Sequence, residues 1–185
     1  MSPLRRLALP PREPEPHGLE KKAAVALIFG PDDDLLFIRR AERKGDPWSG
    51  DMAFPGGRAE PYDPDLVATA ARETAEEIGL DLGSSMFLGA LPPLQTPVRL
   101  PIGNFGVFPF VWRVDAWPRE FVTSDEVAAV HRYAFDRLAS GDGRSTFRYV
   151  GHGRDVELPC VDLDGARIWG LTLRMVDTLL ERLAR

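Results

Sequence analysis

Continuous apolar runs separated by turn residues recur along the chain and predict several strands. The run Ala23–Phe29 is long enough for a buried strand, and a second run covers Leu35–Arg40. Between them lie a glycine, a proline and three aspartates, which favour a turn and predict that the two strands form a hairpin. Further strands are predicted within Phe87–Leu91, Gly106–Val114 and approximately Phe147–Pro159.

Two segments instead show the spacing of a helix. The first covers Asp65–Gly79, with Asp63 or Asp65 near its N-cap and Gly79 at its C-terminal stop. One narrow face of this helix carries small and apolar side chains suited to packing on a sheet: Val67, Ala70, Ala71, Thr74 and Ile78. The second, Leu171–Leu183, is amphipathic. Strands mixed with a few helices predict an α/β layered fold.

Length and charge limit the organisation and the partners. A chain of 185 residues suits one globular domain, which we place at residues 21–185 behind a proline-rich tail, 1–20, either disordered or draped on the domain. The net charge of −5 gives no indication of nucleic-acid or membrane binding. No apolar run approaches the length of a membrane span, and a single cysteine, Cys160, fits a reducing, cytoplasmic compartment.

Three glutamates stand close together in the first helix. Glu73 and Glu77 lie one turn apart on its flank, and Glu76 lies further round. A solvated helix face is the simpler interpretation, but the like-charged pair costs about 0.2–0.5 kcal/mol and opposes the helix dipole. A divalent cation would reverse this repulsion, because Mg²⁺ takes carboxylate oxygens as ligands. A metal site therefore competes with the solvated face as an explanation.

A double-glycine turn precedes this helix. Gly56 and Gly57 follow Phe54 and Pro55. Glycine lets the backbone approach a ligand closely, so a carbonyl here would be able to complete a coordination shell begun by the glutamates. The alternative is an ordinary turn.

Together these residues resemble the signature of the Nudix hydrolases, G-x5-E-x7-R-E-U-x-E-E-x-G-U, in which U is aliphatic. The matching residues are Gly57, Arg72, Glu73, Glu76, Glu77, Gly79 and Leu80. Asp63 stands where the pattern has glutamate, eight residues rather than seven separate it from Arg72, and Thr74 fills an aliphatic position.

The longer, aspartate-containing loop is similar to that of the coenzyme A diphosphatase branch of the family. The branch's upstream pattern, LLTxR-[SA]-x3-R-x3-G-x3-FPGG, is matched in part at Leu36, Arg40, Ala41, Gly50, Phe54, Pro55, Gly56 and Gly57. Gly45 occupies the position of its second arginine, which leaves the substrate open. Near the C-terminus, residues 168–172 resemble the branch's IWGLT segment.

The resemblance implies an α/β/α sandwich with a mixed central sheet and an Mg²⁺- or Mn²⁺-dependent pyrophosphohydrolase. Glu73 and Glu77 would be the main metal ligands, with Glu76 assisting and a carbonyl of Gly56 or Gly57 contributing, while Arg72 would orient the glutamates. The general base would be Glu76 or Glu126, although Glu126 also fits an acid in an N-terminal helix turn. The expected substrate is a small nucleotide, with coenzyme A or an acyl derivative ahead of a nucleoside diphosphate sugar, dinucleotide or nucleoside triphosphate.

A basic cluster stands out in this acidic chain. Arg39, Arg40, Arg43 and Lys44 would hold substrate phosphates, or form a solvated strand end and loop. Trp169 is expected to be a packing anchor for the last helix. Two alternative hypotheses for the function are a non-catalytic nucleotide-binding module and an acidic patch that binds a protein partner. A homodimer is left open.

Overall fold

The computed structural model describes residues 7–43, 49–83, 87–95, 104–151 and 154–184. Its larger sheet has eight strands in this part of the chain. They are β1 (Lys21–Phe29), β2 (Asp34–Arg40), β3 (Met52–Ala53), β4 (Gly56–Arg58), β5 (Phe87–Ala90), β6 (Leu94–Gln95), β7 (Phe105–Arg113) and β8 (Val127–Ala134). The helices are α1 (Leu66–Ile78), α2 (Phe135–Ala139) and α3 (Gly170–Leu183).

The larger sheet is mixed. Its main path runs β3-β2-β1-β7-β5, with β1 and β7 parallel and the other pairs antiparallel. The predicted hairpin of β1 and β2 is confirmed. Strand β4 also pairs with β1, with Gly57 opposite Ala24 and Gly56 opposite Val25. This pairing brings the double-glycine segment under α1, which contacts both β1 and β4.

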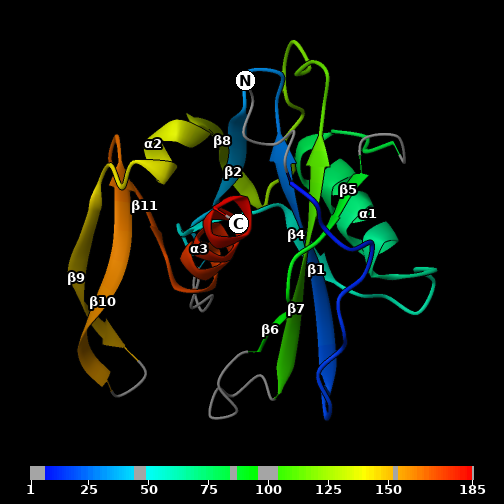
Figure 1. Ribbon diagram of the computed structural model, residues 1–185, viewed down its shortest axis with the longest axis horizontal. Helices are drawn as coiled ribbons and strands as arrows, with labels where there is room; N and C mark the ends of the chain where they lie inside the picture. Colours follow the sequence, from blue (N-terminus) through cyan, green and yellow to red (C-terminus); the bar gives the residue numbers. More distant parts are fainter. Residues whose placement is uncertain (1–6, 44–48, 84–86, 96–103, 152–153, 185) are drawn as a thin grey trace.

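Alternate residues of β1 enter two separate cores because successive side chains of a strand point to opposite faces. Ala24, Ala26 and Ile28 pack on the α1 side. Leu27 and Phe29 pack on the other side, against α3. Figure 1 shows α1 on one side of the sheet and α3 on the other. The predicted α/β fold with a mixed central sheet is confirmed.

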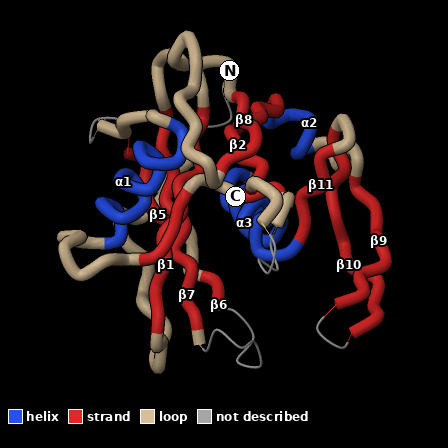
Figure 2. Tube along the Cα trace, turned by 180° about the vertical axis from the view of Figure 1, so that it is seen from behind, coloured by secondary structure: helices blue, strands red, loops and turns tan. Residues whose placement is uncertain are grey.

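A second sheet lies beyond α3 and extends the predicted sandwich. It contains β9 (Arg144–Gly151), β10 (Arg154–Leu163) and β11 (Ala166–Trp169) in the order β11-β10-β9. Helix α3 contacts β10 and β11, and Figure 2 shows this sheet at the opposite end of the molecule from α1. The sequence predicts strand within Phe147–Pro159 but not a separate sheet, because alternation does not show which strands will pair.

The ends of α1 are set by local chemistry. Asp65 is the N-cap, and its side chain accepts a hydrogen bond from the amide of Ala68. Gly79 ends the helix with a φ of 68°, and its N–H donates to the Ala75 carbonyl. The predicted helix is therefore confirmed. Among the helices of the described segments, none is both long and apolar enough to cross a membrane.

Residues 7–20 lie against the domain. The Pro10 carbonyl accepts a hydrogen bond from the amide of Ala90 at 2.7 Å, which satisfies a donor of strand β5. Glu13 pairs with Arg182 of α3 at 2.9 Å. This part of the proline-rich segment thus joins strand β5 to the C-terminal helix.

Candidate active site

Arg72 is the hub of the polar cluster on α1. Its Nε and Nη2 donate to the two carboxylate oxygens of Asp63 at 2.8 and 2.9 Å. Nη1 donates to Glu73 at 2.9 Å and to Glu76 at 3.0 Å. Nη2 also donates to the Arg58 carbonyl at 3.1 Å. Every N–H group of the guanidinium therefore has an acceptor, and this single side chain joins the loop to two glutamates of the helix.

Asp63 has a role that the sequence pattern did not reveal. The carboxylate is only 5% exposed. It also accepts hydrogen bonds from the Thr69 hydroxyl and the Glu60 amide, each at 2.9 Å. The bidentate Arg72 guanidinium holds the pKa of Asp63 well below its usual range. Asp63 is thus not the helix cap but the residue that holds Arg72 in place. The eight residues that separate Asp63 from Arg72 in the sequence fit the path of this loop.

Glu77 is the most unusual acid of the cluster. Its side chain is buried with 5% of its surface exposed, and one carboxylate oxygen accepts a hydrogen bond from the Gly56 amide at 2.8 Å. Burial, together with the negative charges of Glu73 and Glu126, raises the pKa of Glu77 to about 7 against the opposing effects of the Gly56 amide and Arg40. A buried carboxylate among like charges gives no stability of its own.

Gly56 is required by its backbone contacts and positive φ, whereas Gly57 leaves room for the end of the Glu73 side chain. A Cβ atom on Gly57 would lie 2.4 Å from the carboxylate carbon of Glu73. Gly56 has a φ of 149°, and a Cβ there would lie 2.2 Å from the Ala24 carbonyl oxygen. Burial also raises the pKa of Glu73. The glycine segment therefore lets a backbone strand lie directly against two partly desolvated carboxylates.

The donor set fits a hard divalent cation. Glu73, Glu76 and Glu77 supply only oxygen atoms, which Mg²⁺ and Mn²⁺ favour. Within the described segments, no three His, Cys, Asp or Glu side chains are already gathered as a metal site. One oxygen of Glu73 and one of Glu76 accept from Arg72. Each carboxylate has a second oxygen, so pairing with Arg72 is compatible with metal ligation.

Glu126 lies in a turn directly before β8, not in a helix turn. Its side chain is 51% exposed and accepts a hydrogen bond from Arg43 at 3.1 Å. Its charge is close enough to Glu77 to raise the pKa of that residue. The Ser124 amide donates to the Glu77 backbone carbonyl at 2.9 Å, which ties the turn to the end of α1. The fold thus brings this acid, distant in sequence, to the helix glutamates.

The basic residues of the predicted cluster have different surroundings. Arg40 is close enough to Glu77 to lower its pKa. Arg43 pairs with Asp125 and Glu126. Arg39, the neighbour of Arg40 on β2, lines a pocket between the two sheets. Lys44 lies outside the described residues. Arg39 and Arg40 therefore lie in different surroundings, and the role of the basic cluster in holding substrate phosphates stays a prediction.

Comparison with known proteins identifies the family. The family model for the NUDIX domain matches residues 19–150. The chain belongs to the Nudix family. This confirms the family prediction made from the glutamate motif, and the match includes every element that positions Arg72 and the glutamates.

Two curated relatives resemble this Nudix protein over most of its length. It is 33% identical over 153 residues to the human protein named mitochondrial coenzyme A diphosphatase NUDT8, covering 81% of this chain and 63% of that protein. It is 34% identical over 134 residues to a Nudix hydrolase, NudL, of Pectobacterium atrosepticum, covering 71% and 66%. The chain thus spans slightly less than two thirds of these relatives. The predicted resemblance to the coenzyme A diphosphatase branch is confirmed.

Solved structures support the Nudix fold. The NUDIX domain of Shewanella oneidensis NrtR, determined with ADP ribose, has a TM-score of 0.61 at 16% identity and covers 99% of both chains. A MutT/nudix family protein from Enterococcus faecalis has a TM-score of 0.60 at 16% identity, covering 94% of this chain and 66% of that one. At these identities the likeness concerns the fold alone.

Glu77 predicts a pH dependence for the stability of the metal-free Nudix domain. Its folded pKa of about 7 exceeds the ordinary value of 4.5, so the folded protein binds this proton more tightly than the unfolded chain. The stabilisation is complete below pH 4.5 and is lost as the pH rises through about 7. Urea unfolding with a chelator, at about pH 5 and about pH 8, should show the parent losing about 2–3 kcal/mol more than Glu77→Gln. Equal losses in the two proteins would contradict the pKa assignment.

Proposed function

We propose that this protein is an Mg²⁺- or Mn²⁺-dependent pyrophosphohydrolase acting on a nucleoside diphosphate derivative. The observation that carries the proposal is the buried carboxylate of Glu77, held against the glycine segment beside the like charges of Glu73 and Glu126. A buried carboxylate of this kind costs free energy in the protein alone, whereas a bound cation would take its oxygens as ligands and offset the charge.

Glu73 and Glu77 would hold the metal, with Glu76 assisting and the carbonyl of Gly56 or Gly57 contributing. When bound, the ion supplies charge neutralisation for the pyrophosphate and a lowered pKa for water. Arg72 orients Glu73 and Glu76 through its two Nη1 hydrogen bonds. Asp63 holds Arg72 in turn, so the loop and the helix keep one relative position.

Glu126 is the proposed general base, with Glu76 as the alternative. It faces the cluster from a separate turn, and its half-exposed carboxylate is accessible to water. Arg43 limits its orientation through the 3.1 Å hydrogen bond. A carboxylate placed in this way can accept a proton from water as the water oxygen bonds to one phosphorus and the bridging phosphorus–oxygen bond breaks, releasing the other phosphate.

Coenzyme A or an acyl derivative is the proposed substrate, giving 3′,5′-ADP and a 4′-phosphopantetheine fragment. Two observations support this choice: the aspartate-containing loop, and the similarity to a human protein named as a coenzyme A diphosphatase. Gly45, in place of the branch's second arginine, favours the alternative of a nucleoside diphosphate sugar, dinucleotide or nucleoside triphosphate. A cytoplasmic location and a homodimer remain predictions from the sequence.

A substrate panel tests this choice. The protein is incubated with Mg²⁺ and coenzyme A, acetyl-coenzyme A, ADP-ribose, a dinucleotide and a nucleoside triphosphate, and products are identified by mass spectrometry. We expect release of 3′,5′-ADP from coenzyme A. Turnover of another compound without such release would replace the proposed substrate but keep the reaction class. No turnover of any of them would favour the non-catalytic binding module.

Metal binding should also raise thermal stability. A ligand that binds the folded state at about 100 times its dissociation constant stabilises that state by about 2.7 kcal/mol. We therefore expect the unfolding temperature to rise with Mg²⁺ or Mn²⁺, and to rise much less in Glu73→Gln. The absence of any Mg²⁺-dependent shift in the parent protein would favour the acidic-patch interpretation, in which the glutamates serve a protein partner.

A further inference from the structure

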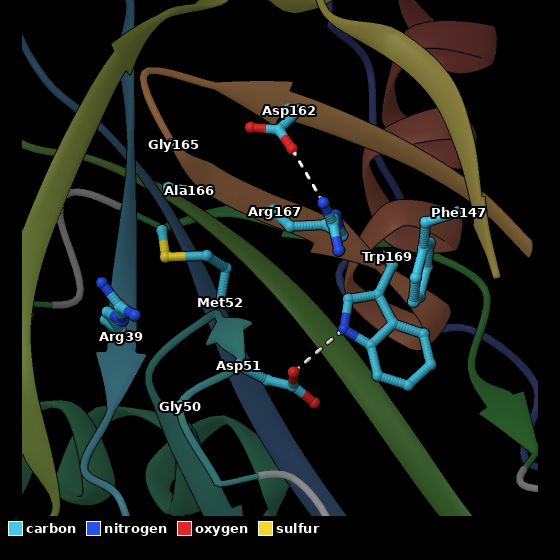
Figure 3. Close-up of a pocket in the computed structure, with 10 residues that line it drawn as sticks. All are labelled: Arg39, Gly50, Asp51, Met52, Phe147, Asp162, Gly165, Ala166, Arg167 and Trp169. Carbon is cyan, nitrogen blue, oxygen red and sulfur yellow. Dashed lines mark hydrogen bonds and ion pairs between the residues drawn. The ribbon is translucent and has the colours of Figure 1, made fainter. Parts of the chain in front are cut away.

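A pocket of about 280 Å³ lies between the two sheets, away from the helix glutamates. Figure 3 shows Arg39 of β2 on one side, Trp169 of β11 and Phe147 of β9 on the other, and Asp51 near the floor. Pockets for small molecules begin at about 300 Å³. The pocket therefore suits one ring system with its attached charge, not a whole coenzyme.

The aromatic wall of the pocket is held rigidly. Trp169 packs edge-on against Phe147, with ring centres 5.4 Å apart, and is tilted against Tyr149 at 5.3 Å. Its indole N–H donates to a carboxylate oxygen of Asp51 at 3.0 Å. The expected role of Trp169 as a packing anchor does not account for this arrangement, which fixes the ring from both its edge and its polar end. An immobilised, partly exposed indole at a pocket wall is suited to stacking.

The two arginines of the pocket differ in their partners. Arg167 lies over the Phe147 ring at 4.8 Å and pairs with Asp162 at 3.2 Å. Arg39 is exposed and, in the segments that the structure describes, makes no side-chain hydrogen bond or ion pair. A guanidinium left without an internal acceptor in a chain of net charge −5 is available to an anion.

Strand β2 connects this pocket to the glutamate cluster. Arg39 and Arg40 are consecutive, so their side chains leave the strand on opposite faces. The Arg40 side chain lies toward Glu77, and its backbone N–H donates to the Asp51 carbonyl at 3.0 Å. Asp51 also holds Trp169. The pocket and the glutamates therefore lie on opposite faces of the sheet near the end of β2, and a substrate that occupies both has to pass around that end.

We propose that this pocket binds the nucleotide half of the substrate, with the purine stacked on Trp169 and a phosphate on Arg39. The proposal rests on the proposed function in placing the pyrophosphate at the glutamates and in taking the nucleotide half from coenzyme A. A planar base matches the indole, and a phosphate matches the guanidinium in geometry and charge. The pantetheine arm, a flexible chain without an aromatic ring, has no such match here.

The test measures binding without turnover. Isothermal titration calorimetry of the metal-free full chain with 3′,5′-ADP should show binding, and Arg39→Gln should weaken it about tenfold or more. Trp169→Phe should weaken it by a smaller factor, because phenylalanine keeps a ring but offers less area for stacking. Arg148→Gln is the matched control. It removes the same charge from an exposed arginine of β9 that pairs with Asp155 and does not line the pocket.

The outcomes separate this proposal from the proposed function. If the protein turns over coenzyme A but Arg39→Gln and Trp169→Phe bind 3′,5′-ADP with unchanged affinity, the pocket assignment is overturned and the proposed function is retained. If 3′,5′-ADP binds in a way that depends on both residues but no compound is turned over, the pocket assignment is supported and the proposed enzymatic activity is contradicted. The proposal is overturned if the wild-type protein does not bind 3′,5′-ADP. It is also overturned if Arg39→Gln keeps 3′,5′-ADP binding but loses binding of 4′-phosphopantetheine. Arg39 is exposed, so its replacement should leave the fold unchanged.

Discussion

Replacement of Glu77 by glutamine should lower turnover by about 10²- to 10³-fold while the metal-free protein becomes no less stable. Glutamine keeps an oxygen for the Gly56 amide, which donates to Glu77 at 2.8 Å in the parent. It also removes a buried negative charge whose pKa is raised to about 7 by burial and by neighbouring acids. The same change therefore removes a metal ligand and relieves a repulsion.

The measurement combines steady-state kinetics under saturating Mg²⁺ with urea unfolding in chelator above neutral pH. Glu181→Gln, an identical change at an exposed position of α3, serves as the control and should leave both quantities unchanged. An unaltered turnover number in Glu77→Gln would refute the assigned role. A large loss of stability would instead mean that the carboxylate is a structural acceptor.

Replacement of Arg72 by lysine should lower turnover by about 10- to 100-fold, the range found when residues that support metal ligands are changed. Lysine keeps the positive charge but cannot donate in the fork that binds both oxygens of Asp63. It also cannot reach Glu73, Glu76 and the Arg58 carbonyl together. We expect the glutamates to lose their common orientation, with a higher Mg²⁺ concentration needed for half-maximal activity.

Arg148→Lys provides a matched control for this second change. Arg148 also makes a two-point pair with an aspartate, Asp155, at 2.7 and 2.6 Å, but on an exposed hairpin. Its replacement should leave both stability and turnover essentially unchanged, because exposed ion pairs contribute little to stability. Kinetics of Arg72→Lys that match those of the control would show that charge alone, and not the fork geometry, is needed at position 72.

Some features of the site could be predicted because they depend on nearby residues. Asp65 and Gly79 set the ends of α1 through a side-chain cap and a left-handed backbone, and both act within four residues. The position of Glu73 and Glu77 on one flank follows from the helix repeat. The like charge of this pair then indicated a cation before any fold was known.

Other features depend on contacts between distant segments. The raised pKa of Glu77 depends on its burial where α1 packs on β1 and β4, and on the charges of Glu73 and Glu126, whereas the Gly56 amide opposes it. The partnership of Asp63 with Arg72 depends on the path of the loop, so spacing alone suggested a cap. The pocket needs two sheets that pair independently, and no local pattern assigns β9, β10 and β11 to a sheet of their own.

The glutamate motif was enough to predict the family, and local periodicity and capping were enough to predict the glutamate-bearing helix with its ends and the hairpin of β1 and β2. Which charges are buried, how Asp63 holds Arg72 and which arginine faces the pocket depend on contacts of the folded chain. Burial and the pairing of charges arise when segments far apart in the chain come together. They are properties of the packed molecule and not of any one stretch of residues.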